Sequence, residues 1–468
     1  MSTADDPSRS ETDVAPVVAR KPIPVFTQGS TLRHVLAMTA SGSVGLVAIF
    51  VVDFLSLLYV SRLGDPVLTA SVGFASQVLF FAMSVNIAMS IAISALVSRA
   101  LGAGKRPRAQ RFAGSGLVHV AAVSIVVSAI MFALRGQILD LVGARGEAHD
   151  VAARYLAITL PSNILMALGM SLQGLVRAVG DPRRAMYVTL VGAIVTAILD
   201  PLLIFVLGFG VYGAAIATAF SRLVFTLVGS WGAIHVHGIV GRPQRKWVVR
   251  DLWPMMGIAA PAILTNLATP VGNTYALRVF ASFGDETIAA FAIIDRIAPV
   301  AFGVLFALTG SIGPIIGQNF GAGLYDRIRR AMFDCFAVSG IYVLVVWFLL
   351  WLAGPHIASI FGAEGATRDL VLFFCAFGSA AWLALAGLFV ANTAFNNLGF
   401  PILATVFNWG RATLGTIPFV TYGAHRWGPE GGYAGVIAGA ALFGSAAVIT
   451  CFYVTARLAR QGAPKVSE

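Results

Sequence analysis

Long runs of apolar residues, separated by short polar or charged breaks, fill the chain from residue 35 to residue 456. A helix that crosses a bilayer needs about 20 consecutive apolar residues. Of the 468 residues, 58% are hydrophobic and only 11% are charged, which excludes a soluble globular fold. The pattern predicts an all-α integral membrane protein with twelve transmembrane spans, over residues 35–60, 67–98, 112–134, 151–176, 185–207, 213–236, 253–281, 287–317, 333–353, 370–397, 401–422 and 432–456.

The charged residues predict the orientation of these spans. The loops after spans 2, 4, 6 and 8 each contain at least three Lys or Arg, whereas each odd-numbered loop contains at most two. Basic loops stay in the cytoplasm, so we expect both termini to be cytoplasmic in a protein of the cell (inner) membrane. The predicted organisation is a disordered tail (1–31), an N-lobe (32–236), an inter-lobe loop (237–252), a C-lobe (253–456) and a second cytoplasmic tail (457–468).

An internal repeat relates the two lobes. The segment LGAGKRPRAQR, residues 101–111, aligns with FGAGLYDRIRR, residues 320–330, at an offset of 219. At the same offset, Gly180 falls on Gly399 and Pro182 falls on Pro401. Each repeat has an even number of spans, so both lobes enter the membrane from the same side. The repeat predicts two six-helix lobes related by a pseudo-two-fold axis along the membrane normal, which is a transporter architecture.

Two acids lie within apolar runs of the N-lobe, Asp53 in FVVDFLSLL and Asp200 in VTAILDPLLIF. A carboxylate inside a membrane is costly and needs a polar partner or a proton. Such groups take up and release H⁺, or with neutral oxygens they bind a small cation such as Na⁺. The alternative is a structural role in capping helices, and the Asp-Pro pair at residue 200 also favours a turn.

Other polar residues within the spans leave two interpretations open. Asp295 in span 8 is a candidate contact for a cationic substrate, or it is neutralised by an arginine. Polar side chains in spans 4 and 10 line a substrate cavity, or they form hydrogen bonds between helices. The candidate partners of Asp295 are Arg222, Arg278, Arg296 and Arg411, and the candidate cavity residues are Asn163, Gln173 and Asn392.

Several other functions lack a sequence signal. The three cysteines lie in apolar stretches without a disulfide or metal-site pattern, and His235 and His237 do not share a helix face. The sequence contains neither a P-loop nor a nucleophile elbow, so we expect no enzyme activity, resident cofactor or metal site. We assign the net charge of +11 to cytoplasmic loops rather than to nucleic-acid binding.

Several motifs together resemble the multidrug and toxic compound extrusion (MATE) family. The resemblance covers about residues 32 to 456, and it implies a two-lobe antiporter with twelve helices. Members expel organic, often cationic compounds in exchange for H⁺ or Na⁺. The motifs are VSRLGDPVLTASVGFA, LVSRALGAGKRPRAQR, VRAVGDPRRAMYVTLVGAIVTAILDPLLIF, GVYGAAIATAFSR and IIGQNFGAGLYDRIRRA.

The resemblance implies a coupling site in the N-lobe. Asp200 matches the family's fifth-span Asp, and Thr196 occupies the Asn position four residues earlier. In the first span the Asp position is Ser56, and Asp53 lies three residues before it, about one helical turn away. The position of an early proline is Ser41. We therefore expect Asp53, Asp200, Ser56 and Thr196 to bind the coupling cation.

The C-lobe lacks the acids that some sodium-coupled relatives have in spans 7 and 10, which favours H⁺ over Na⁺ as the coupling ion. We expect a multidrug efflux antiporter that acts as a monomer in the bilayer on small organic substrates. The alternatives are a flippase for lipid-linked saccharides, a membrane-embedded enzyme and a passive channel. No selectivity-filter ring or catalytic constellation is readable in the sequence.

Overall fold

The computed structural model describes residues 25–461, and this part of the chain is helical without strands. The first half contains six spans. The fourth span is broken into two helices that meet at 52°, and the fifth and sixth spans end in π-helical turns. Its elements are α1 (Thr31–Ser61), α2 (Pro66–Gly102), α3 (Arg106–Ala133), α4 (Arg135–Leu141), α5 (Gly146–Thr159), α6 (Asn163–Ala178), α7 (Pro182–Pro201), η2 (Leu202–Val206), α8 (Val211–Ser230) and η3 (Trp231–Val236).

The second half repeats this order. Its last helix contains two residues with non-helical backbone angles, Trp427 and Gly428, and this kink separates the last two spans. Counting the bent pair α5–α6 as one span and dividing the last helix at this kink gives the twelve predicted spans. The elements are α9 (Arg245–Ala281), α10 (Asp285–Gly321), α11 (Tyr325–Ile360), α12 (Gly365–Ala376), η4 (Gly378–Ala380), α13 (Ala381–Leu398), α14 (Pro401–Gly410), η5 (Arg411–Gly415) and α15 (Ile417–Gln461).

The repeated Gly-x-Pro motif forms a helix start in each half, as GDP at residues 180–182 and as GFP at residues 399–401. Gly180 has a φ of 93°, Asp181 caps α7 by accepting from the amide of Arg184, and Pro182 occupies the first helical position. Proline is favoured there because its missing N–H would have no intrahelical partner. The equivalent Gly399 has a φ of 95° and precedes Pro401 at the start of α14. The repeated motif therefore encodes the same turn in both halves.

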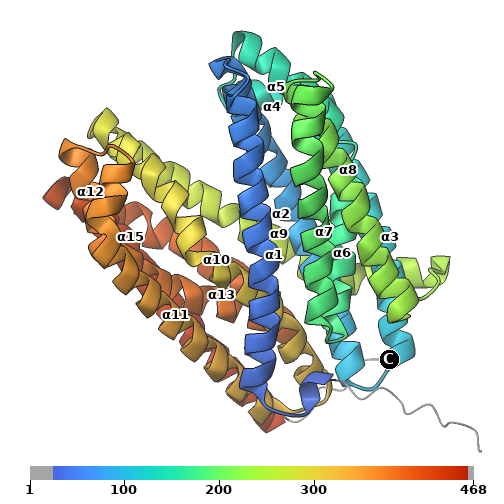
Figure 1. Cartoon of the computed structure of the whole chain (residues 1–468). Helices are drawn as coiled ribbons and strands as arrows, with labels where there is room; N and C mark the ends of the chain where they lie inside the picture. The colour runs from blue at the N-terminus through green and yellow to red at the C-terminus, as the bar shows by residue number, and fades with distance from the viewer. Residues whose placement is uncertain (1–24, 462–468) are drawn as a thin grey trace, which may run out of the picture.

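The two halves form two bundles, as the sequence predicts. Figure 1 shows α1–α8 in one bundle and α10–α15 in the other, diverging toward the upper end of the view and converging where α1 begins. The loops at the converging end are 103–105, 179–181, 237–244 and 322–324, and the adjoining helix starts contain the arginine and lysine clusters. We call this the basic end.

Three predicted boundaries differ from the structure. The predicted tail 1–31 includes a 3₁₀ turn, Val25–Thr27, in which Phe26 is only 2% exposed, so residues 25–30 are not a disordered tail. Residues 1–24 lie outside the described part. Helix α9 begins at Arg245, within the predicted inter-lobe loop, and α15 continues to Gln461, within the predicted second tail. Charged helix ends extend beyond apolar windows, which explains both extensions.

Candidate functional site

A buried carboxylate in the N-lobe is the centre of the candidate site. Asp200 of α7 is 1% exposed, and the hydroxyl of Ser56 in α1 donates a hydrogen bond to its Oδ2. Its Oδ1 has no hydrogen-bond partner among the described residues. A buried polar atom without a partner is uncommon in folded proteins. The free oxygen therefore offers a position for a proton or a small cation.

The two other predicted coupling residues lie close to this pair. Asp53 is exposed on α1, one turn before Ser56, and its charge lies within electrostatic range of Asp200. Thr196 lies one turn before Asp200 on α7, and its hydroxyl donates to its own helix at Gly192 O, at 3.2 Å. The structure thus joins Ser56 and Asp200 directly, with Asp53 nearby.

Sequence reasoning missed part of the surroundings of this site. Tyr155 of α5 is 7% exposed and lies within electrostatic range of both acids and of Arg222. Arg222 of α8 donates to Thr159 O and to Ser162 Oγ, both at 2.9 Å, where α5 and α6 separate. Its position in the N-lobe shows that Arg222 is not the partner of Asp295. Tyr155 lacked a sequence signal, because tyrosine is common in apolar helices.

Asp295, the candidate substrate contact in the C-lobe, has no arginine partner among the described residues. Asp295 is exposed on α10, and the described residues contain no ion pair that includes it. Arg278 and Arg296 are also exposed. The structure therefore does not support the neutralised-pair interpretation, because no arginine of the described chain lies within ion-pair distance of Asp295.

Arg411, at the start of η5, is the basic side chain inside the C-lobe. It is 9% exposed, and one of its terminal nitrogens donates to Thr269 Oγ1 at 3.0 Å. Its Nε has no partner among residues 25–461. Intramembrane arginines almost always face a bundle interior or a water-filled cavity, and π-helical turns are frequent at functional sites.

Two candidate cavity residues form hydrogen bonds between helices instead. Asn163 is 3% exposed; it accepts from Asn86 at 2.8 Å and donates to Ser124 and Ser128. Gln173 is also buried and donates to two acceptors on α7. Their assignment to a substrate cavity is therefore corrected, because their polar groups are occupied within the N-lobe.

Asn392 of the C-lobe differs from these two. It is 9% exposed, and its Oδ1 has no partner in the described chain. Gln173 and Asn392 are 219 residues apart and so occupy equivalent positions in the repeat. The amide of Gln173 donates hydrogen bonds within the N-lobe, whereas the amide oxygen of Asn392 has no hydrogen-bond partner in the described part of the C-lobe.

The lobes contact each other at the basic end through repeat-equivalent residues. Arg99 of α2 donates to Asn397 O at 2.9 Å, and its equivalent Gln318 of α10 donates to Ala178 O, the equivalent acceptor, at 2.8 Å. Between them the helices touch backbone to backbone. A Cβ on Gly102 would lie 1.9 Å from Gln318 O, and one on Gly321 would lie 2.0 Å from Arg99 O. We call these reciprocal contacts the seam.

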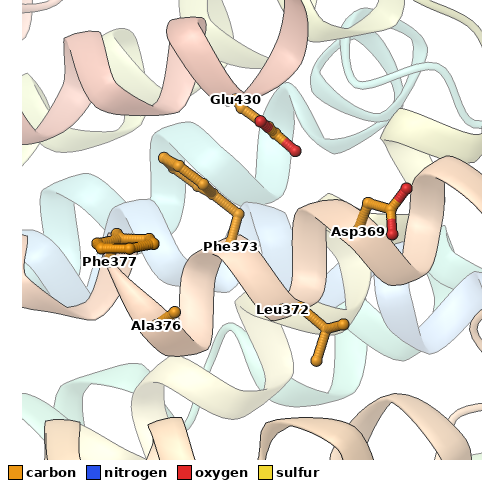
Figure 2. Close-up of a pocket in the computed structure, with 6 residues that line it drawn as sticks. All are labelled: Asp369, Leu372, Phe373, Ala376, Phe377 and Glu430. Atoms are coloured by element: carbon orange, nitrogen blue, oxygen red, sulfur yellow. The ribbon is translucent and has the colours of Figure 1, made fainter.

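Among the described residues, the acidic side chains of the predicted site do not form a metal cluster. Residues 25–461 contain no group of three or more His, Cys, Asp or Glu side chains positioned to hold a metal ion. Figure 2 shows a cavity of about 280 Å³ elsewhere, between α12 and Glu430 of α15. It is lined by Asp369, Leu372, Phe373, Ala376, Phe377 and Glu430, none of which is a predicted site residue.

A sequence model of the MatE family matches residues 43–202 and 261–421, which are the corresponding parts of the two lobes. The chain belongs to the MatE family. The MatE match therefore agrees with the fold and with the internal repeat, and the chain is a multi-pass membrane transporter of the multidrug type.

Three proteins that the chain is similar to are named as transporters or export proteins. A FAD transporter of Shewanella oneidensis is 27% identical over 436 residues, which covers 91% of this chain and 94% of that protein. The multidrug export protein MepA of Staphylococcus aureus is 20% identical and is matched over 85% of this chain and 86% of its own length. The MATE transporter VcmN of Vibrio cholerae, in its bent form, shares the fold with a TM-score of 0.86 at 23% identity, covering 91% and 97%.

Proposed function

We propose that this protein is a secondary active exporter that exchanges small organic, often cationic compounds for H⁺. The observation that carries the proposal is the buried carboxylate of Asp200, which has one oxygen bonded to Ser56 and one oxygen without a partner. The described residues provide no neutralising cation for this charge within ion-pair distance. A proton satisfies such a site, and Na⁺ is the other cation that oxygen ligands would hold.

The lobe arrangement explains how this site is coupled to export. The lobes meet at the basic end and diverge at the other, and the positive-inside rule assigns the basic end to the cytoplasm. A substrate between the lobes then has access to the outside. Protonation of Asp200 changes its bond to Ser56 and so changes how α1 packs on α7. Coupling requires that the proton and the substrate favour different arrangements of the lobes.

We also propose the remaining properties of this exporter. It acts as a monomer, because one chain contains both lobes and so a complete pathway. It lies in the inner membrane with both termini in the cytoplasm. It needs no resident cofactor or metal and does not catalyse a chemical reaction. Its coupling residues are Asp53, Asp200, Ser56 and Thr196, and Asp295 and Asn392 contact the substrate.

A second candidate function is export of an anionic substrate such as a flavin dinucleotide. Arg411 favours it, because its guanidinium has an unpartnered Nε and no acid within ion-pair distance among the described residues. The FAD transporter among the relatives gives a specific compound to test. Arginine binds phosphate groups well because its planar fork matches their oxygens.

Transport assays distinguish these functions. Purified protein in proteoliposomes is tested for ethidium efflux, FAD efflux and movement of a lipid-linked diphosphate sugar. Ethidium efflux that Asp200→Asn abolishes and Arg411→Gln leaves intact supports the cation exporter. FAD efflux lost in Arg411→Gln supports the second candidate. Movement of the lipid-linked sugar without efflux of either compound supports the flippase.

A further inference from the structure

Residues 25–30, which we call the strap, cross the basic end of the molecule just before α1. The amide of Phe26 donates to Gln318 Oε1 at 2.9 Å, and its carbonyl accepts from Asn319 Nδ2 at 3.1 Å. Its ring is 2% exposed and packs edge-to-face on His34 at 5.3 Å. Both backbone polar groups of Phe26 and its ring thus have partners in the folded molecule. The strap is therefore a docked element of the fold.

One arginine of the C-lobe fastens the strap. Arg327 of α11 donates to the carbonyls of Phe26, Gln28 and Gly29 at 3.0, 3.2 and 3.0 Å. Its guanidinium also donates to Asn319 Oδ1 at 3.1 Å. Hydrogen bonds from a charged donor are stronger than those between neutral groups.

The strap also contacts the N-lobe. Val25 packs on Gly180, where the Cβ of Val25 lies 2.9 Å from the position that a Cβ on Gly180 would take. Gln318, which accepts from Phe26, donates its Nε2 to Ala178 O across the seam. The strap is thus bonded to the side chain that joins the two lobes, and it touches both lobes at once.

The strap has no counterpart in the second half of the chain. Residues 244–249, which lie 219 positions later, form the start of α9. The seam itself is reciprocal, with Arg99 and Gln318 at equivalent positions, but a strap partner is present on the Gln318 side alone. This asymmetry identifies the strap as an addition to the repeat rather than as part of it.

We propose that the strap is a latch that holds the basic end closed. Opening this end requires the seam to separate, and separation pulls Gln318 away from Ala178 and Gly180 away from Val25. When the lobes separate, the strap cannot keep its contacts with both Arg327 of the C-lobe and Gly180 of the N-lobe. Each opening therefore breaks some of the strap contacts. These contacts exist in the closed arrangement and so shift the equilibrium toward it, as differential binding requires.

A buried cysteine placed in the seam reports its opening. Ser98 is fully buried on α2, and its Cβ lies 2.7 Å from the position that a Cβ on Gly317 of the other lobe would take. The three native cysteines, Cys335, Cys375 and Cys451, are at most 1% exposed. The assay measures the rate at which a water-soluble maleimide labels Ser98→Cys in the purified full-length protein, with neither substrate nor ion gradient.

Four changes are compared in this background. Removal of residues 2–30, Phe26→Ala and Arg327→Gln each remove strap contacts. Phe26→Ala removes the buried ring and keeps the backbone hydrogen bonds, whereas Arg327→Gln removes hydrogen bonds to the strap carbonyls. Each change is expected to speed labelling about tenfold. Phe333→Ala is the matched control, because this phenylalanine of α11 is 66% exposed. The labelling rate of this control is expected to equal that of the Ser98→Cys protein without a further change.

The point variants keep the test decisive if the deletion does not fold. Faster labelling of Phe26→Ala and Arg327→Gln, with Phe333→Ala at the starting rate, supports the latch. Labelling of both strap variants at the starting rate overturns it. Because the assay uses no transport, a failure of the latch is distinguishable from a failure of the proposed export function.

Discussion

The hydroxyl of Ser56 in α1 donates a hydrogen bond to the buried carboxylate of Asp200 in α7. Helix α1 also packs against the other lobe. A Cβ placed on Gly42 of α1 would lie 3.3 Å from the Cβ of Ala307 in α10. The N-terminal end of α1 continues from the strap. Helix α1 therefore connects the buried carboxylate with the interface between the lobes.

Asp200→Asn is expected to abolish coupled export. The amide has nearly the same size as the carboxylate, so the N-lobe packing is kept while the group can no longer exchange a proton. Drug resistance of cells that express the variant measures the effect, with membrane expression as the control. Resistance at the level of the unchanged protein contradicts the assignment.

Ser56→Ala is expected to reduce transport about ten- to a hundredfold without abolishing it. The loss of one hydrogen bond to a charged group costs about 1.5–3 kcal/mol, and the acid itself remains. Ser71→Ala in α2 is the matched control, because the buried Ser71 hydroxyl donates to its own helix at Val67 O, at 2.6 Å, and Ser71 is not one of the proposed coupling residues. Initial efflux rates in proteoliposomes compare the two variants, and equal losses argue against a specific role of Ser56.

Asp53→Asn is expected to weaken binding of the coupling cation while transport persists. Asp53 is exposed and adds a nearby negative charge, but it does not contact Asp200 through a hydrogen bond. Removing a nearby negative charge lowers the affinity of Asp200 for a cation. The half-saturating proton concentration for efflux measures this effect. Complete loss of transport in a folded variant shows instead that Asp53 is the essential acid.

Gly102→Val is expected to prevent the closed basic end. A Cβ at this position would overlap the backbone oxygen of Gln318. The two helix backbones, α2 and α10, would have to move apart to make room for it. Transport is expected to fall at least about tenfold, because the cycle loses one of its end states. The matched control is Gly257→Ala in α9, where no atom lies within 4 Å of the added Cβ. Efflux rates and chromatographic homogeneity distinguish a gating defect from misfolding.

Asp181, in the loop before α7, gives a pH-dependent contribution to stability. Burial raises the pKa of this carboxyl, but hydrogen bonds from the amide and guanidinium of Arg184 and from His237 outweigh burial, so its pKa lies below the ordinary value. Its stabilisation is therefore fully present above the ordinary pKa and is lost as pH falls through the lowered one. Asp181→Ala is expected to cost about 1 kcal/mol at pH 7 through loss of the helix cap.

The melting temperature in detergent measures this difference. The gap between Asp181→Ala and the unchanged protein is expected to narrow as the pH falls below the ordinary aspartate range. A gap that stays constant from neutral to acidic pH shows that the charge of Asp181 contributes nothing.

The fold was largely predictable because the hydropathy pattern and the repeat are long-range signals in the sequence itself. Gly180 and Gly399 have nearly the same positive φ, so their shared motif reports the same turn. The break in span 4, between Thr159 and Asn163, was not predicted, although Pro161 lies in it and proline interrupts helices. The kink at Gly428 lies between two predicted spans, where the glycine and proline were visible.

The site was less predictable because its contacts join distant parts of the chain. Asp200 was found from its charge in an apolar helix, but only the structure shows that Ser56, rather than Asp53, bonds to it. Asp53 and Ser56 are three residues apart, so their side chains lie about 60° apart around the axis of α1, and the sequence does not distinguish which of them reaches Asp200. Burial of Phe26 depends on Gln318, 292 residues away, and so has no local signal.

Ethidium efflux from proteoliposomes, driven by a pH gradient alone and then by a Na⁺ gradient alone, tests the central claim most directly. The unchanged protein and Asp200→Asn are measured side by side. We predict efflux driven by the proton gradient in the unchanged protein and none above the protein-free background in the variant. Proton-driven efflux at an equal rate in Asp200→Asn contradicts the claim that this buried carboxylate couples the proton to export.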